Sequence, residues 1–288
     1  MNVLSLFDGM SCGQIALNKL DIPVTKYYAA EIDKYAMQIA KKNYPDTIHL
    51  GDVRDVDGYD LGDIDLLIGG SPCQGFSFAG KQLNFDDPRS KLFFEFVRLL
   101  DECKPTYFML ENVKMKKESA AVITEYLGVE PIEINSNLVS AQNRKRLYWT
   151  NIPFEGMPED KGILLKDILE QAPEEFTLMS DKFTKRNADT GCLIDSTKPK
   201  ASNLSAMEYV KNGRQGDYLE CNQDGVPTQS NKHWRKLTPT ECERLQTVPD
   251  GYTEGVSNTQ RYKMLGNGWT VDVIAHILKP LQNNGELQ

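Results

Sequence analysis

The stretch Ile64-Asp65-Leu66-Leu67-Ile68-Gly69-Gly70-Ser71-Pro72-Cys73-Gln74-Gly75-Phe76-Ser77 decides the fold that we expect for this chain of 288 residues. It begins with an apolar run whose length and composition predict a buried β-strand. Two glycines end the run, and Pro72 then fixes the backbone immediately before Cys73. Open α/β sheets bind ligands at the carboxyl ends of their strands, so a thiol here is well placed to act on one. The alternative is that Cys73 is a small buried apolar residue, as most free cysteines are.

Other expected strands also end in small or acidic residues. Asn2–Phe7 predicts a first strand, and the turn Asp8-Gly9-Met10-Ser11-Cys12-Gly13 then leads into a helix. This arrangement can present backbone N–H groups to an anionic group, although the turn is not the GxGxxG fingerprint. Lys26–Ala30 predicts a second strand, and Glu31 follows it where a ribose hydroxyl is commonly held. Asp33 is expected to cap the helix that comes next. With Asp52 after a third strand, these ends predict a nucleoside-bearing cofactor.

Two later segments carry groups suited to proton transfer or to anion binding. Thr106–Leu110 predicts a short strand that ends at Glu111. A carboxyl directly after an apolar strand can be partly desolvated and carry a proton near neutrality. The segment Gln142-Asn143-Arg144-Lys145-Arg146 lies between two further expected strands. If it is extended, both arginines project from one face.

Composition excludes several classes of protein. The chain is 40% hydrophobic and 26% charged, and no apolar run approaches the ~18 residues of a membrane span. The N-terminal residues lack the charged region of a signal peptide, so we expect a cytoplasmic protein. Six scattered cysteines without a CxxC pair, and only three histidines, support neither a zinc site nor a disulfide framework.

The net charge of −8 first argues against a nucleic-acid partner, but the charge is unevenly distributed. From residue 176 to residue 236, ten Lys and Arg side chains exceed seven Asp and Glu side chains, which leaves this part at +3 and the rest at −11. Short basic clusters are usually solvated surface, so the charge permits a nucleic-acid partner without indicating one.

The domain organisation follows from shifts in composition. Composition shifts after Asn151, a short helix is expected at Ile163–Leu169, and Phe176–Trp234 is polar with weak periodicity. Residues 151–234 therefore predict a smaller second domain or a large insertion. Regular structure is expected again from Arg235, where Thr238 can cap a helix that has Pro239 at its first position and Glu241 three residues beyond the cap. An apolar helix is expected at Val273–Leu278.

Taken in order, these landmarks resemble those of the S-adenosylmethionine-dependent DNA (cytosine-5) methyltransferases. The matching segments are Phe7-Asp8-Gly9, Glu31-Ile32-Asp33, Asp52-Val53, Ser71-Pro72-Cys73-Gln74, Glu111-Asn112-Val113, Gln142-Asn143-Arg144-Lys145-Arg146 and Gly266-Asn267-Gly268. The first ~150 residues and the last ~50 are covered well, whereas 151–234 are covered only by position. Ser11 and Cys12 stand where many relatives have two glycines.

The resemblance implies an α/β fold, a Rossmann-like methyltransferase sheet with helices on both faces, plus a small target-recognition domain. Residues 1–150 would form the catalytic and cofactor-binding domain, and 151–234 the target-recognition region. The C-terminal segment, 235–288, would return to the catalytic domain.

The implied reaction transfers a methyl group from S-adenosylmethionine to C5 of a cytosine flipped out of duplex DNA. Cys73 would add to C6 as the nucleophile, Glu111 would meet N3, Arg146 would hold O2 and Arg144 would support the site. Asn112 would fix the loop that bears Cys73. The implied DNA contacts are Gln74, Ser77 and Arg89.

The implied cofactor site draws on several strand ends. Glu31 would bind the ribose hydroxyls, and Asp52 and Val53 the adenine. The full set that the resemblance assigns to the cofactor is Phe7, Asp8, Gly9, Ser11, Cys12, Glu31, Ile32, Asp52, Val53, Pro72, Asn267 and Trp269.

Three alternatives fit parts of this sequence. Transfer-RNA cytosine methyltransferases share much of this motif set. A nicotinamide-dependent oxidoreductase would explain the strand ends but not Pro72-Cys73-Gln74. An inactive relative that only binds DNA would not need Cys73, Glu111 and Arg146 together. We expect a monomer that acts on double-stranded DNA without a metal or a membrane, and the resemblance allows a cognate restriction endonuclease as a partner.

Overall fold

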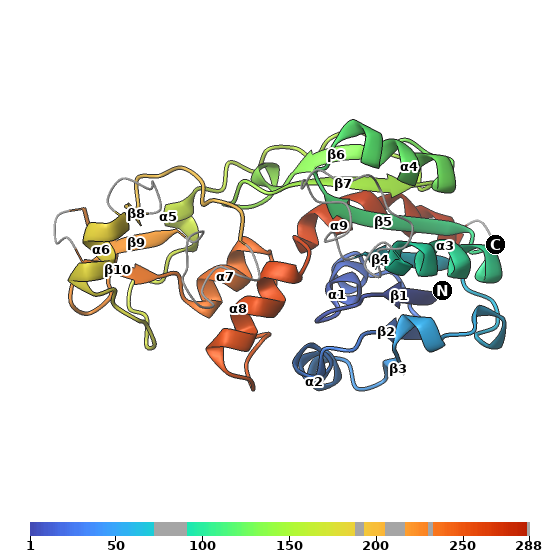
Figure 1. Cartoon of the computed structure of the whole chain (residues 1–288), viewed down its shortest axis with the longest axis horizontal. Helices are drawn as coiled ribbons and strands as arrows, with labels where there is room; N and C mark the ends of the chain where they lie inside the picture. The colour runs from blue at the N-terminus through green and yellow to red at the C-terminus, as the bar shows by residue number, and fades with distance from the viewer. Residues whose placement is uncertain (72–90, 188–192, 205–216, 230–232, 287–288) are drawn as a thin grey trace. The chain divides into compact units, whose positions relative to one another are not determined.

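The computed structural model describes residues 1–71, 91–187, 193–204, 217–229 and 233–286 (Figure 1). The chain divides into two compact units. The first contains Met1–Ile134, Lys145–Met157 and Ile274–Gln288, and the second contains Asn135–Arg144 and Pro158–Val273. The division into catalytic and target-recognition domains stays a prediction.

A seven-stranded sheet carries the candidate site residues of the first unit (Figure 1). Across the sheet its strands are β3 (Ile48–Gly51), β2 (Lys26–Ala30), β1 (Asn2–Leu6), β4 (Leu66–Gly70), β5 (Tyr107–Val113), β7 (Lys145–Thr150) and β6 (Ile132–Asn135). The five strands from β3 to β5 are parallel, and β7 runs antiparallel to β5. The carboxyl ends of the five parallel strands therefore lie along one edge of the sheet.

The central strands β1 and β4 are buried on both faces, to which their side chains point alternately. One face packs on α3 (Lys91–Cys103) and α4 (Lys117–Leu127) in a single apolar cluster that includes Leu4, Leu67, Phe96, Leu110, Ile123 and Trp149. On the other face, Gly13 of α1 (Cys12–Lys19) lies so close to Ile68 that a Cβ there would be 2.4 Å from Ile68 Cδ1. The expected α/β sheet with helices on both faces is confirmed.

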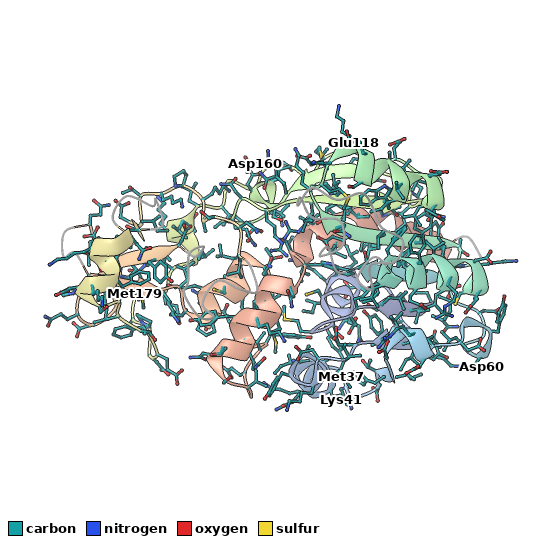
Figure 2. The ribbon with its side chains drawn as sticks, in the orientation of Figure 1. Met37, Lys41, Asp60, Glu118, Asp160 and Met179 are labelled. Carbon is teal, nitrogen blue, oxygen red and sulfur yellow. The ribbon has the colours of Figure 1, made fainter. Side chains whose placement is uncertain are left out.

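The helix α2 (Lys34–Asn43) shows how local sequence sets an element. Asp33 is its N-cap and accepts hydrogen bonds from the N–H groups of Tyr35 at 3.0 Å and Ala36 at 3.3 Å, as the sequence predicts. Its buried residues, Ala36, Ile39 and Ala40, have helical spacing. Met37 is partly exposed and Lys41 is exposed on the same helix (Figure 2). Two short 3₁₀ helices, η1 (Val53–Asp55) and η2 (Gly58–Asp60), follow β3.

The strand β5 is longer than the sequence predicts. The expected strand ends at Leu110, whereas β5 continues to Val113. The cause is the antiparallel partner β7, which pairs with all three added residues, Glu111, Asn112 and Val113. Glu111 therefore lies within the strand and level with Gly70 of β4.

The second unit combines short helices with a three-stranded sheet in the order β10-β9-β8. Its elements are η4 (Ser136–Leu138), α5 (Leu165–Ile168), α6 (Asp181–Asn187), β8 (Leu193–Ile194), β9 (Tyr218–Cys221), β10 (His233–Lys236), α7 (Pro239–Leu245) and α8 (Asn258–Asn267). The predicted capping box of Thr238 and Glu241 begins α7. The helix α9 (Val271–Leu278) begins in this unit and continues in the first, where η5 (Lys279–Glu286) ends the described chain.

Among the described residues, no helix has the length and apolar content needed to cross a membrane.

Candidate active site

The ends of β1 and β2 are tied together by one carboxylate. Glu31 Oε2 accepts a hydrogen bond from the Gly9 N–H at 2.8 Å. Its other oxygen accepts from the N–H groups of Ile32 at 2.8 Å and Asp33 at 2.7 Å. Each carboxylate oxygen has two acceptor sites, so Glu31 can still accept from a ligand hydroxyl.

The turn between β1 and α1 has an unusual backbone. Phe7, Gly9 and Ser11 all have left-handed φ values, of 57°, 59° and 65°. Glycine adopts this conformation freely, whereas for Phe7 and Ser11 it costs ~1–3 kcal/mol each. A turn that keeps such strain at the ligand-binding edge of a sheet is typical of a site that approaches its ligand closely.

Asp8 holds this turn from within the fold. Its carboxylate is buried and accepts hydrogen bonds from the Tyr27 hydroxyl at 2.8 Å and from the Ser11 hydroxyl. Burial raises the pKa of Asp8 to about 6. The space beside Tyr27 is full, because a Cβ on Gly13 would be 2.8 Å from the tyrosine oxygen. The side chain of Asp8 therefore fixes the shape of the turn.

The raised pKa of Asp8 makes a prediction for stability. Since the folded pKa, about 6, exceeds the ordinary value of 3.8, the folded state takes up this proton more readily, and the resulting stabilisation is lost as the pH rises through 6. Asp8→Asn removes the titrating carboxyl group and keeps a side chain of similar size. We expect the free energy of unfolding of Asp8→Asn, relative to wild type, to rise by up to about 3 kcal/mol between pH 4 and pH 8. Urea unfolding at several pH values measures it, and a pH-independent difference would contradict the role of burial.

The end of β3 presents a charged side chain. Asp52 caps η1 by accepting from the Arg54 N–H at 3.0 Å, and its carboxylate also pairs with the Arg54 guanidinium at 2.5 Å. These bonds lower the pKa of Asp52 to about 2, so it is ionised at neutral pH. The neighbouring Val53 is buried. At the end of β2, by contrast, the apolar side chain of Ile32 is 71% exposed and can cover an apolar ligand surface.

A carboxylate and a guanidinium meet where β5 pairs with β7. Arg146 Nε lies 2.9 Å from Glu111 Oε1, and the two side chains are only 12% and 11% exposed. The contact is diagonal across the ladder, because Arg146 is opposite Val113 and Glu111 is opposite Tyr148. The sequence prediction that groups Glu111 with Arg146 agrees with this geometry.

Asn112 anchors the end of β4. Its Nδ2 donates to the Ser71 carbonyl at 3.2 Å and to the Ser71 hydroxyl oxygen at 3.1 Å, and both residues are buried. Ser71 is the last described residue before Pro72 and Cys73. The amide of Asn112 therefore fixes the backbone at the point from which the segment with Cys73 departs. Sequence reasoning gave Ser71 no separate role.

Arg144 has a different environment from Arg146. It is 3% exposed, and its Nη1 donates to the Leu204 carbonyl at 2.6 Å. Its Nη2 donates to the carbonyls of Gly268 at 2.8 Å and Gly266 at 3.2 Å. The two arginines differ in local backbone, because β7 begins at Lys145 and so includes Arg146 but not Arg144. Within the second unit, Arg144 holds the backbone on both sides of Asn267.

Two further residues of the second unit, which sequence reasoning missed, hold the segment that leads to Arg144. Lys200 Nζ donates to the carbonyls of Asn137 at 2.8 Å, Ser140 at 3.1 Å and Ile163 at 2.5 Å. Gln246 accepts a bond from Gln142 at 2.9 Å. No sequence signal marks such partners, because each contact joins residues far apart in the chain.

The remaining predicted site residues have varied positions. Pro72, Cys73, Gln74, Ser77 and Arg89 lie outside the described residues. Cys12 is buried at the start of α1, while Asn267 ends α8 and Trp269 is buried just beyond it. The described part of the chain contains no group of three or more His, Cys, Asp or Glu side chains that could hold a metal ion.

The fold is an open α/β sheet, and its strand β5 carries a buried Glu111–Arg146 pair. Residues 1–283 match the family model of the C-5 cytosine-specific DNA methylases. The chain belongs to this family and is a DNA (cytosine-5) methyltransferase.

Several relatives extend along nearly the whole chain. Type II methyltransferase M1.ScrFI of Lactococcus lactis subsp. cremoris is 31% identical over 97% of this chain and 77% of its own length. Type II methyltransferase M.NlaX of Neisseria lactamica is 30% identical over 97% of this chain and 96% of its own. Type II methyltransferase M.HhaI of Haemophilus parahaemolyticus is 28% identical over 96% and 93%, respectively.

Solved structures support the fold. The S. pombe Dnmt2 methyltransferase superposes with a TM-score of 0.80 at 20% identity, over 98% of this chain and 99% of that one. The Entamoeba histolytica methyltransferase EhMeth gives a TM-score of 0.82 at 18% identity, over 99% and 98%. These likenesses establish the fold.

Proposed function

We propose that this methyltransferase uses S-adenosylmethionine to methylate C5 of cytosine in duplex DNA through a covalent adduct of Cys73. The observation that carries the proposal is the arrangement around the ends of β4 and β5. There the buried Glu111–Arg146 pair lies beside the end of β4, where Asn112 binds the backbone of Ser71. The family match over residues 1–283 supports the same reaction.

The residues at the strand ends suit S-adenosylmethionine. Gly9, at φ +59°, has open space where a side chain would begin, so a ligand can approach the backbone there. Glu31 has one acceptor site left for a ribose hydroxyl, and Ile32 offers an exposed apolar surface beside it. Asp52 and Val53 would hold the adenine. When bound, the cofactor supplies an electrophilic methyl group. Asn267 and Trp269 are proposed as further cofactor contacts.

The chemistry of cytosine explains why these side chains are needed. C5 is a poor nucleophile until a thiolate adds to C6. In the proposed step the Cys73 sulfur forms a bond to C6, and the C5–C6 π electrons become available at C5. Negative charge then extends towards N3, where a proton held by Glu111 stabilises it. When C5 takes the methyl group, the bond from that carbon to the cofactor sulfur would break, and S-adenosylhomocysteine would leave as a neutral thioether. Loss of the C5 proton to a base and of the thiolate from C6 then restores the aromatic ring.

Arg146 has two proposed roles in this step. Its guanidinium has five N–H donors, so it can keep its bond to Glu111 and also hold the cytosine O2. Arg144 is proposed to support the site through the backbone that it holds at Gly266 and Gly268. It acts as a positioning residue, because its guanidinium also donates to Asn203 Oδ1 and to the Leu204 carbonyl oxygen.

The DNA must be distorted for this reaction. A base inside the duplex cannot be attacked at C6, so the target cytosine is flipped out at a cost of a few kcal/mol. Gln74, Ser77 and Arg89 are proposed DNA contacts, and 151–234 the region that reads the target sequence. The Type II names of the relatives support a restriction–modification context. We propose a cytoplasmic monomer that acts with a cognate restriction endonuclease.

Methyl transfer to two substrates tests this function. The purified protein is incubated with methyl-tritiated S-adenosylmethionine and either duplex genomic DNA or total transfer RNA. We expect label in 5-methylcytosine of the DNA, at least about 100-fold above that in transfer RNA. Bisulfite sequencing of the same DNA then identifies the target sequence. Label in transfer RNA but not in DNA would overturn the choice of substrate.

A further inference from the structure

The loop that follows β3 is held by a side chain from α3. Arg98 Nη2 donates to the Val53 carbonyl oxygen at 3.1 Å. The guanidinium is itself held on both sides, because Nε donates to Glu95 at 2.8 Å and Nη1 donates to Glu102 at 2.8 Å. Its carboxylate partners lie three residues before and four residues after it on the same helix. Arg98 therefore has little freedom to leave the Val53 carbonyl.

The same helix holds η2 through a second contact. Glu102 Oε2 accepts a hydrogen bond from the Gly58 N–H at 2.9 Å while it also binds Arg98. Gly58 packs tightly here, since a Cβ at this position would be 2.7 Å from Glu102 Cβ and 2.9 Å from Cys103 Sγ. Two consecutive turns of α3 thus fix the loop at Val53 and at Gly58. Asp60, beyond the second contact, is exposed (Figure 2).

Arg98 makes a contact that an ordinary surface ion pair would not require. Exposed pairs contribute ~0–1 kcal/mol, and Arg98 could satisfy Glu95 and Glu102 without any bond to the loop. Its Nη2 instead reaches the backbone of the residue directly after Asp52. Hydrogen bonds from a charged donor are stronger than neutral ones, so this bond restrains the Val53 backbone.

We propose that Arg98, held by Glu95 and Glu102, is a positioning residue that sets the adenine selectivity of the cofactor site. This inference rests on the proposed assignment of Asp52 and Val53 to the adenine. The adenine amino group can donate to the Asp52 carboxylate, whereas hypoxanthine has a carbonyl oxygen at the same ring position. When the loop is fixed, the site binds adenine more tightly than hypoxanthine. With hypoxanthine, the Asp52 carboxylate would face a carbonyl oxygen and lack a hydrogen-bond donor.

Binding of two ligands tests the proposal. Calorimetric Kd values are measured for S-adenosylhomocysteine and for its inosine analogue, with wild type, Arg98→Gln, Arg98→Lys and Glu102→Gln. For Arg98→Gln we expect about tenfold weaker binding of the adenine ligand, as for loss of one charge-assisted hydrogen bond, and less than about threefold change for the analogue. Arg98→Lys should retain part of the selectivity, and Glu102→Gln should bind the adenine ligand about threefold more weakly.

Arg244→Gln is the matched control, because Arg244 also pairs with a carboxylate, that of Asp250, and has the same side-chain exposure as Arg98, 33%. It should leave both Kd values unchanged. Thermal unfolding checks each variant, and Glu102→Gln keeps the test available if Arg98→Gln does not fold. If Arg98→Gln lost affinity equally for both ligands, or lost none for either, the proposed role of Arg98 would be overturned. If the wild-type protein bound neither ligand, the proposed cofactor would be wrong instead.

Discussion

Replacement of Cys73 by serine is expected to lower the rate of DNA methylation by more than about 10⁴-fold. The reason is chemical, because a serine hydroxyl is almost wholly protonated at neutral pH, whereas a few per cent of an ordinary thiol is already thiolate. Single-turnover transfer of a tritiated methyl group to duplex DNA measures the loss.

The Cys73→Ser variant should still bind S-adenosylhomocysteine and duplex DNA with Kd values within about threefold of wild type, since only a nucleophile has been removed. Cys221→Ala is the control, because Cys221 is a buried residue of β9 in the second unit and has no proposed part in the reaction. Methylation by Cys73→Ser at more than a few per cent of the wild-type rate would contradict the proposed nucleophile.

Replacement of Glu111 by glutamine is expected to lower the same rate by about 10²–10³-fold. Glutamine has nearly the same shape but cannot supply a proton to N3 of the base. The change also leaves Arg146 without its carboxylate at a site where both side chains are nearly nine-tenths buried. Breaking a buried pair can cost ~3–5 kcal/mol of stability, so unfolding must be measured alongside the rate.

Glu133→Gln is the matched control for Glu111→Gln. It breaks the ion pair between Glu133 and Lys114, whose side chains are 36% and 57% exposed. This exposed pair should matter little to stability or to rate. Equal loss of rate in both variants, or loss fully explained by unfolding of Glu111→Gln, would remove Glu111 from the reaction.

Local sequence predicted the parts of the site that depend on single elements. The apolar runs gave the positions of β1, β2 and β4, and the acidic residues after β2 and β3 lie at the ligand edge of the sheet. Asp33 and Thr238 cap their helices as expected. In each case the deciding interactions join residues fewer than five apart, or follow from strand periodicity.

Contacts between distant residues were not predictable in the same way. Asn112 was expected to fix the Cys73 loop, but its partner Ser71 is 41 positions away. Arg144 was grouped with Arg146 by alternation, yet its Nη2 bonds reach residues 122 and 124 positions away. The extension of β5 likewise depends on β7 as a partner. Such contacts depend on how the elements pack, which a short sequence motif does not encode.

The roles of Asp8 and Arg98 illustrate a general feature of the edge where β1, β2 and β3 end. Glu31 and Asp52 lie where a ligand can reach them, and each belongs to a turn that other side chains hold in shape. Asp8 holds the first turn through Tyr27 and Ser11, while Arg98 holds the loop after β3. Positioning residues of this kind can be altered without removing a proposed ligand contact, which makes their effects on binding separable from chemistry.

The most direct test of the central claim is covalent trapping on DNA that contains 5-fluorocytosine at the target site. Fluorine at C5 blocks the final proton removal, so the Cys73 adduct at C6 cannot be released after methyl transfer. With S-adenosylmethionine present, we expect a complex that survives denaturation and yields a nucleotide-modified peptide at Cys73 by mass spectrometry. No complex under conditions where ordinary DNA is methylated, or attachment through a different residue, would contradict the account.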